Sequence, residues 1–152
     1  MIHLKKVCRL DVTLAPPLEI AETPAGFRRV IPITGGTFTG ERINGTILPG
    51  GADWNVVRHD GVVHLWARYT LRTDDGVLIS ILNAGLQRGP KDTMARILAG
   101  ETIDPSDWYS RTAPRFEVAG EQYRWLNEAV FVGDLLPPQS ADKVSIEVYE
   151  VL

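Results

Sequence analysis

Hydrophobic and polar residues alternate along much of the chain, which is the pattern of half-buried β-strands. The clearest case is the segment 4–14, whose residues of one parity are mostly apolar: Leu4, Lys6, Cys8, Leu10, Val12 and Leu14. Val7 is the apolar exception on the other parity, and Ala15-Pro16-Pro17 ends the pattern. We therefore predict a strand here, with Cys8 buried as a small hydrophobe rather than exposed as a reactive thiol.

The remaining alternating segments predict a largely β protein with a single helix. The predicted strands are 27–33, 53–59, 62–73, 77–86, 116–118, 123–132 and 144–151. Asp60-Gly61 and Asp74-Asp75-Gly76 are hairpin turn signals. Residues 90–98 form the predicted helix, because Pro90 suits a first turn and Gly100 is a fitting stop. Pro32 indicates an edge strand or a strand end.

A glycine-rich run at 35–54 stands out within this pattern. Its glycines alternate with apolar and β-branched residues that need burial, and they are Gly35, Gly36, Gly40, Gly45, Gly50 and Gly51. Such a run is typical of bent, closely packed β-structure, with glycine where the strand kinks or another backbone approaches.

Many short strands with one helix are typical of an all-β antiparallel barrel or sandwich. Several strands are long, and glycines can relieve strain at barrel corners, so we favour a compact antiparallel β-barrel with one short helix. The length of 152 residues suits a single domain over 1–152.

Composition narrows the choice of partner and compartment. The net charge of −3 argues against nucleic-acid binding, which usually requires a basic surface. Cys8 is the only cysteine, so no disulfide forms within the chain and a reducing compartment is expected. Neither a signal peptide nor an apolar stretch long enough to span a membrane is visible, so we expect a soluble cytoplasmic protein without a membrane partner.

Signatures of metal, nucleotide and nucleophilic chemistry are weak. His3, His59 and His64 form no His-x-His pair, and no Gly-rich loop opens a predicted helix. No Gly-x-Ser-x-Gly elbow is present. We therefore expect no bound metal and no cofactor.

The long strand 62–73 has one core face and one mixed face. The mixed face holds His64, Trp66, Arg68, Thr70 and Arg72, and it either lines a wet pocket or lies outside against another subunit. Arg68 is a candidate site residue, because a guanidinium group suits a ligand carboxylate or enolate. The alternative is a surface or interface arginine.

Asp53 is the candidate base. It follows the turn Pro49-Gly50-Gly51, where an aspartate often bonds only to the turn backbone. Alternatively, it is a carboxylate at the mouth of the barrel whose pKa is raised by apolar neighbours, suited to accept a proton. Trp54 beside it is then a wall of the ligand pocket.

Other candidate ligand-binding residues come from later in the chain. A strand at 123–132 would place Trp125 and Asn127 on one face, together with Tyr123, either lining a pocket or packed in the core with Asn127 bonded to backbone. Arg111, in a loop before Phe116, either binds a ligand carboxylate or lies on the surface. Asn83 in the strand 77–86 completes the candidate set.

Four motifs together resemble a known family. They are Gly35-Gly36-Thr37-Phe38, the segment 48–54 (LPGGADW), the segment 67–76 (ARYTLRTDDG) and Trp125-Leu126-Asn127. This combination resembles the uncharacterised family called domain of unknown function 3237, or uncharacterised protein family 0311. The resemblance implies a compact antiparallel β-barrel similar to those of allene oxide cyclase and dirigent proteins. It implies no established activity and no assigned catalytic residue.

Three functions remain open at this point. The first is a cofactor-free isomerase, cyclase or lyase on a small oxygenated organic compound, with Asp53 as base, Arg68 or Arg111 holding an anionic group, and Trp54 and Trp125 as walls. This hypothesis rests partly on fold analogy. The second is a non-catalytic ligand carrier. The third is an interaction protein whose face around Trp66 packs on another subunit, and a homodimer is the expected assembly.

Overall fold

The computed structural model describes residues 1–152 and is dominated by one antiparallel sheet. The ten strands of the sheet are β1 (Leu4–Leu14), β2 (Leu18–Thr23), β3 (Gly26–Thr39), β4 (Gly45–Ile47), β5 (Gly51–Val57), β6 (Val63–Thr73), β7 (Leu78–Arg88), β8 (Tyr109–Val118), β9 (Val130–Leu135) and β10 (Lys143–Val151). One α-helix, α1 (Thr93–Leu98), and two 3-10 turns at Pro105–Asp107 and Arg124–Asn127 complete the structure. It contains no helix with the length and hydropathy of a membrane-crossing segment.

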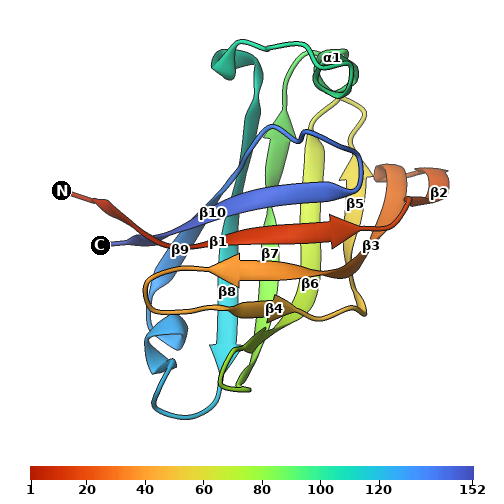
Figure 1. Ribbon diagram of the computed structural model, residues 1–152. Helices are drawn as coiled ribbons and strands as arrows, with labels where there is room; N and C mark the ends of the chain where they lie inside the picture. The colour runs from red at the N-terminus through yellow and green to blue at the C-terminus, as the bar shows by residue number, and fades with distance from the viewer.

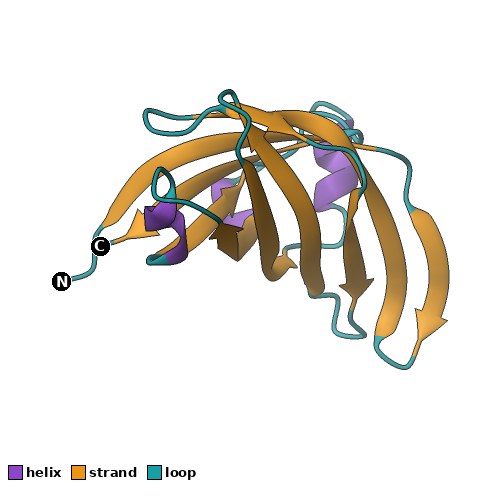
Figure 2. Cartoon of the chain, turned by 90° about the horizontal axis from the view of Figure 1, so that it is seen from below, coloured by secondary structure: helices purple, strands orange, loops and turns teal.

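The sheet closes into a barrel through β3. Its first half pairs with β2 and β5, and its second half pairs with β1 and β4. From β1 the strand order runs through β10, β9, β8, β7 and β6. The next position is occupied by two short strands, β4 and β5, each of which pairs with β6 on one side and with β3 on the other. Figures 1 and 2 show the curved wall that results. The predicted all-β antiparallel barrel with one short helix is confirmed.

The bend in β3 depends on glycine. Gly36 has a φ of +133°, and a Cβ there would overlap the carbonyl oxygen of Asp11 on β1. The register between β1 and β3 also shifts between Thr13 and Leu14. The predicted role of the glycine-rich run, kinks and close backbone approach, is confirmed at this position.

The first predicted strand is confirmed with its bounds. The break in its alternation has a structural cause, because the pairing of β1 with β10 shifts between Lys6 and Cys8. This β-bulge lets Val7 and Cys8 both face the interior, where they are buried. Burial raises the pKa of the Cys8 thiol to about 12, which agrees with its predicted role as a buried hydrophobe.

One predicted strand is wrong in its first half. The segment expected as a strand over 123–132 begins with the 3-10 turn Arg124–Asn127, and β9 starts only at Val130. The side chain of Asn127 accepts a hydrogen bond from Val118 N (2.9 Å) and donates one to Val118 O (2.8 Å). A side-chain amide thus takes the place of a neighbouring strand at the end of β8, which sequence alternation does not reveal.

Two other boundaries also differ from the prediction. Strand β8 begins at Tyr109, so the segment expected as a loop before Phe116 is part of the wall. Helix α1 is shorter than the predicted 90–98 and spans Thr93–Leu98. Pro32 lies within β3, between its pairings with β2 and β1, and its carbonyl accepts a hydrogen bond from Ala15 N (3.0 Å).

The two ends of the barrel differ in packing. The end that carries the 3-10 turn Arg124–Asn127 is filled by aromatic side chains, with Phe131 edge-on to Phe116 at 5.1 Å and near Trp125 at 6.2 Å between ring centroids. The other end carries α1 and the loops after β7 and β9 (Figure 1). The packed end closes the barrel on its side, and an internal space lies toward α1.

We expect Gly36→Ala to destabilise the protein by more than about 2 kcal/mol, because the new Cβ meets the backbone of β1 and the backbone conformation disfavours a side chain. Gly120→Ala is the matched control, since Gly120 also has a positive φ, +83°, but has no neighbour within 4 Å of the added Cβ. Urea unfolding of both variants measures the difference. Equal losses of stability would show that close approach at Gly36 does not matter.

Candidate functional site

A cavity of about 330 Å³ occupies the open half of the barrel, toward α1. Of its 24 lining residues, 14 are hydrophobic, so the space suits a mostly apolar molecule with a few polar groups. Met94 and Leu98 from α1, Trp108, and Pro138 in the loop after β9 lie at its rim. The indole N–H of Trp108 donates to Leu135 O (2.7 Å) and so fixes this part of the wall.

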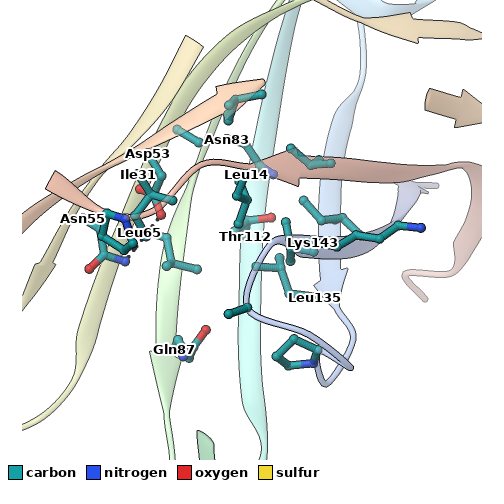
Figure 3. A pocket seen from close by; sticks show the side chains of 18 of the residues that line it. Leu14, Ile31, Asp53, Asn55, Leu65, Asn83, Gln87, Thr112, Leu135 and Lys143 are labelled. Carbon is teal, nitrogen blue, oxygen red and sulfur yellow. Dashed lines mark hydrogen bonds between the residues drawn. The ribbon is translucent and has the colours of Figure 1, made fainter. Parts of the chain in front are cut away.

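Strand β5 contributes two polar residues to the cavity, and on this strand the usual pattern is reversed. Asp53 and Asn55 face the cavity, while Trp54 between them faces outward. Figure 3 shows Asp53 and Asn55 together on one side of the cavity and Lys143 on the other. An apolar outer face and a polar inner face on one barrel strand is the arrangement expected of a functional surface rather than of core packing.

Asp53 is held by two hydrogen bonds. Its Oδ1 accepts from the backbone N–H of Trp66 on β6 (2.9 Å), and its Oδ2 accepts from the side-chain amide of Asn55 (3.4 Å). The carboxylate is therefore fixed in direction, and it remains among the groups that line the cavity.

Asn55 links Asp53 to an arginine. Arg29 on β3 donates from Nε (3.3 Å) and Nη2 (2.9 Å) to the same oxygen, Asn55 Oδ1. A guanidinium group has only donors, so it fixes the amide with its oxygen toward Arg29 and its NH₂ toward Asp53. Asn55 is 2% exposed, and this relay orients the carboxylate without a direct ion pair.

The environment of Asp53 raises the pKa of its carboxyl group above that of an exposed aspartate. Burial raises the pKa of the carboxyl group, and the hydrogen bonds from Trp66 and Asn55, with the charge of Arg29, counteract the rise only in part. A carboxyl group with a raised pKa is better able to take and return a proton near neutral pH than an exposed aspartate is.

Three buried polar atoms in residues of the cavity wall make no hydrogen bond of regular geometry: Tyr69 Oη, Asn83 Oδ1 and Thr112 Oγ1. The side chain of Asn83 lies beside the Tyr69 hydroxyl group and interacts with it only weakly. Ser110 and Gln87, on the same two strands as Thr112 and Asn83, bond to each other instead (3.2 Å). Asn83 was predicted as a ligand-binding residue, and the structure places it in this wall. Its role in binding stays a prediction.

The structure does not bring Arg68 to Asp53. The two residues lie on adjacent strands but on opposite faces, because Asp53 pairs with Ala67 and Arg68 pairs with Ala52. Arg68 and Trp54 instead border a shallow hollow on the outer surface beside Gly50 and Gly51. The prediction that Arg68 holds a ligand group next to Asp53, with Trp54 as a wall, is corrected accordingly.

Three further candidates also lie away from the cavity. Arg111 is on the outer face of β8, where it forms an ion pair with Asp134 (2.7 Å). Trp125 belongs to the packed end, where the guanidinium group of Arg42 stacks on its ring at 4.0 Å. Asn127 bonds to backbone, the alternative that the sequence left open. None of the three lines the cavity.

Sequence reasoning missed Arg29, Asn55 and Thr112, and it placed Tyr69 in the core without a role. A signal for Asn55 existed, since residues 52–56 read apolar at Ala52, Trp54 and Val56 and polar between them. For Arg29 there was none, because its partner lies 26 residues away in the sequence. No three His, Cys, Asp or Glu side chains are grouped to hold a metal ion.

Comparison with known proteins identifies close relatives of this chain. The family model described as "Protein of unknown function (DUF3237)" matches residues 2–151. A protein named UPF0311 from Rhodopseudomonas palustris is 37% identical over 151 residues, which is 99% of this chain and 97% of that protein. The predicted resemblance is confirmed.

Solved structures share the fold. A conserved protein of unknown function from Rhodopseudomonas palustris superposes with a TM-score of 0.90 at 37% identity, covering 100% of this chain and 99% of that one. A β-barrel-like protein from Acinetobacter baumannii gives 0.86 at 36% identity, covering 100% and 97%. A structure described as an enzyme from Penicillium herquei gives 0.75 at 20% identity, covering 99% and 95%, and this likeness shows the fold alone.

The raised pKa of Asp53 predicts a specific pH dependence of stability. The folded state binds a proton more tightly than the unfolded chain, so the associated stability is present below the ordinary value of 3.8 and is lost as pH rises through the folded pKa. The free energy of unfolding of the wild type, minus that of Asp53→Asn, should therefore fall with rising pH and then level off. Urea unfolding across a pH series measures it.

Asp60→Asn is the control with the opposite sign. Hydrogen bonding from Arg58 lowers the pKa of Asp60, so its contribution is present at higher pH and is lost on acidification. The corresponding difference for Asp60→Asn should rise with pH. A rising difference for Asp53→Asn would contradict the environment described for Asp53.

Proposed function

The chain belongs to this family of proteins of unknown function, and we propose that it binds a small, largely apolar, oxygenated organic molecule in its barrel and isomerises, cyclises or cleaves it with Asp53 as base. The observation that carries this proposal is a fixed carboxylate with a raised pKa in the wall of an apolar cavity. In an isomerisation one side chain abstracts a proton from carbon and returns it at another position. In a cleavage the electron pair of the broken C–H bond expels the leaving group, and the same side chain delivers the proton to that group.

The shape of the cavity supports small-molecule binding. Its volume of about 330 Å³ lies at the lower end of the range of about 300–1,000 Å³ found for ligand pockets. Met94 and Leu98 on α1 are 36% and 46% exposed at the rim, although both are large apolar side chains. An apolar rim of this kind favours contact with a ligand that passes through it.

The arrangement around Asp53 supports a base rather than a structural carboxylate. Asp53 forms no ion pair, because Arg29 donates to Asn55 and not to Asp53. The neutral amide of Asn55 and the peptide N–H of Trp66 orient the carboxylate while opposing only part of the pKa rise. Oriented groups on rigid strands are well suited to proton transfer.

A non-catalytic carrier is the second candidate, because hydrophobic residues make up 14 of the 24 that line the cavity. A carrier binds without chemical change, and Asp53 then contributes at most to affinity. The two functions share the cavity and differ only in what Asp53 does.

The first experiment is a thermal-shift screen with phenolic, hydroxy-acid and unsaturated-acid metabolites, followed by mass spectrometry of each stabilising compound after incubation. A ligand at a hundred times its dissociation constant adds about 2.7 kcal/mol of stability, a clear rise in melting temperature. We expect Asp53→Asn to keep the stabilisation and to lower conversion about 10²- to 10⁴-fold, because it removes the base and keeps the shape.

Asp134→Asn is the matched control, since Asp134 pairs with Arg111 on the outer surface and should leave conversion unchanged. Full conversion by Asp53→Asn would overturn the role of Asp53. Stabilisation without conversion by the wild type would favour the carrier.

We also propose that the protein forms a homodimer through the outer face of β5 and β6. Trp54 and Trp66 lie edge-on there with ring centroids 5.8 Å apart, and Trp54 is 40% exposed. Leu86 on the neighbouring strand β7 is 41% exposed. Exposed aromatic residues grouped in this way are typical of protein interfaces.

Trp66→Glu should convert this dimer into a monomer, because the change places a charge in the apolar interface. Light scattering coupled to size exclusion measures the mass of both proteins. Val130→Glu is the matched control, since Val130 is 67% exposed on β9 and lies outside the Trp54–Trp66 pair. A dimeric Trp66→Glu variant, or a monomeric wild type, would contradict the proposal.

A further inference from the structure

The three unpartnered polar atoms identify the part of the cavity wall where a ligand can supply hydrogen bonds that the protein lacks. Tyr69, Asn83 and Thr112 are 4%, 3% and 6% exposed, and their free oxygens are shielded from solvent. A buried polar group without a partner destabilises a protein by about 1–3 kcal/mol. Such groups are rare in native proteins, and a cluster of them in a cavity wall indicates a position where a ligand or water supplies the missing bonds.

Strand register places Asn83 in the same row as Asp53, two strands away. Asp53, Ala67 and Asn83 pair in one row across β5, β6 and β7. Two strand spacings put the Cα atoms of Asp53 and Asn83 roughly 10 Å apart, with only the methyl group of Ala67 between them. Tyr69 is two residues beyond Ala67, toward the packed end, and so forms the floor.

The charges around Tyr69, at the floor of the cavity, disfavour binding of an anion there. The cationic residues of the wall are Arg29 and Lys143. Arg29 is bound to Asn55, and Lys143 is exposed at the start of β10. A carboxylate that reached Tyr69 would lose its hydration, find no cation and lie near the carboxylate of Asp53, which is strongly unfavourable.

We propose that the cavity selects a neutral molecule that enters with a carbonyl or hydroxyl oxygen first and is preferred over the corresponding carboxylate. The entering oxygen accepts a hydrogen bond from the Tyr69 hydroxyl group, and a ligand hydroxyl group in addition donates to Asn83 Oδ1. This inference rests on the proposed function, because it names the substrate class of the same cavity. It assigns Tyr69 and Asn83 as specificity-determining residues.

The chemistry of the two side chains fits a neutral oxygen. The hydroxyl group of Tyr69 can donate to a carbonyl oxygen, and the free Oδ1 of Asn83 can accept from a hydroxyl group. Burial raises the pKa of Tyr69, which keeps the phenol protonated as a donor. Together the two side chains favour binding of a molecule that has one polar end and an otherwise apolar surface.

The test compares two probes of nearly equal shape, 2-acetonaphthone and 2-naphthoate, which differ in having a methyl ketone or a carboxylate on the same ring system. Isothermal titration calorimetry at pH 7 measures their binding to the wild type. We expect the ketone to bind at least about tenfold more tightly than the carboxylate, which is a difference of about 1.4 kcal/mol.

Two variants locate the interaction. Tyr69→Phe should weaken ketone binding about tenfold and leave the melting temperature unchanged or raised, because the hydroxyl group it removes makes no hydrogen bond of regular geometry in the protein. A purely structural role of that hydroxyl group would instead lower the melting temperature. Ala67→Leu should abolish ketone binding by filling the space between Asp53 and Asn83.

Equal or tighter binding of 2-naphthoate, or ketone binding unaffected by Tyr69→Phe, would overturn the inference. The proposed function would survive either result, because its test measures conversion by the wild type and by Asp53→Asn. If neither probe binds at millimolar concentration, the result would count against both the inference and the proposed function, since it would show that the cavity does not take a ligand of this size.

Discussion

The double pairing of β3 is the constraint on which the rest of the structure depends. A single strand pairs with β5 in its first half and with β1 in its second, and this closes the sheet into a barrel. The change of partner requires a bend, and at Gly36 the backbone of β1 comes too close for any side chain. Without this bend the sheet would remain open, and no interior would exist to bury Asp53.

Closure divides the interior into a packed half and an open half. Aromatic packing around Phe131 and the capping of β8 by Asn127 fill one end. Stability can thus be concentrated there, while the other end keeps space and polar groups that a core would not tolerate. This division explains why Trp125, which the sequence predicted as a pocket residue, belongs to the packed end of the barrel and does not line the cavity.

The elements that the sequence predicts well are those governed by local signals. Strand β1 and the two hairpin turns follow from alternation and turn residues, and the four family motifs led to the barrel. The turn at Arg124–Asn127 could not be predicted, because it depends on a side-chain amide bonding to Val118 on another element. Likewise, the alternation of apolar and polar residues separated the two faces of β6 but did not show which face of β5 lies inside the barrel.

Strand β5 shows why the site was only half predictable. Its apolar residues Ala52 and Val56 share the parity of the exposed Trp54 and are buried without lining the cavity, so the ordinary rule that apolar residues point inward would have placed Asp53 outside. Under the proposed function the reversal has a physical reason, because a base must face its substrate. Strand β5 then keeps a half-buried carboxylate at a cost in stability. The unpartnered oxygen of Tyr69 adds a second cost of the same kind. Under the proposal made above, a ligand that hydrogen-bonds with the Tyr69 hydroxyl group removes this second cost, and that is how a native barrel tolerates a polar group without a regular hydrogen bond in its wall.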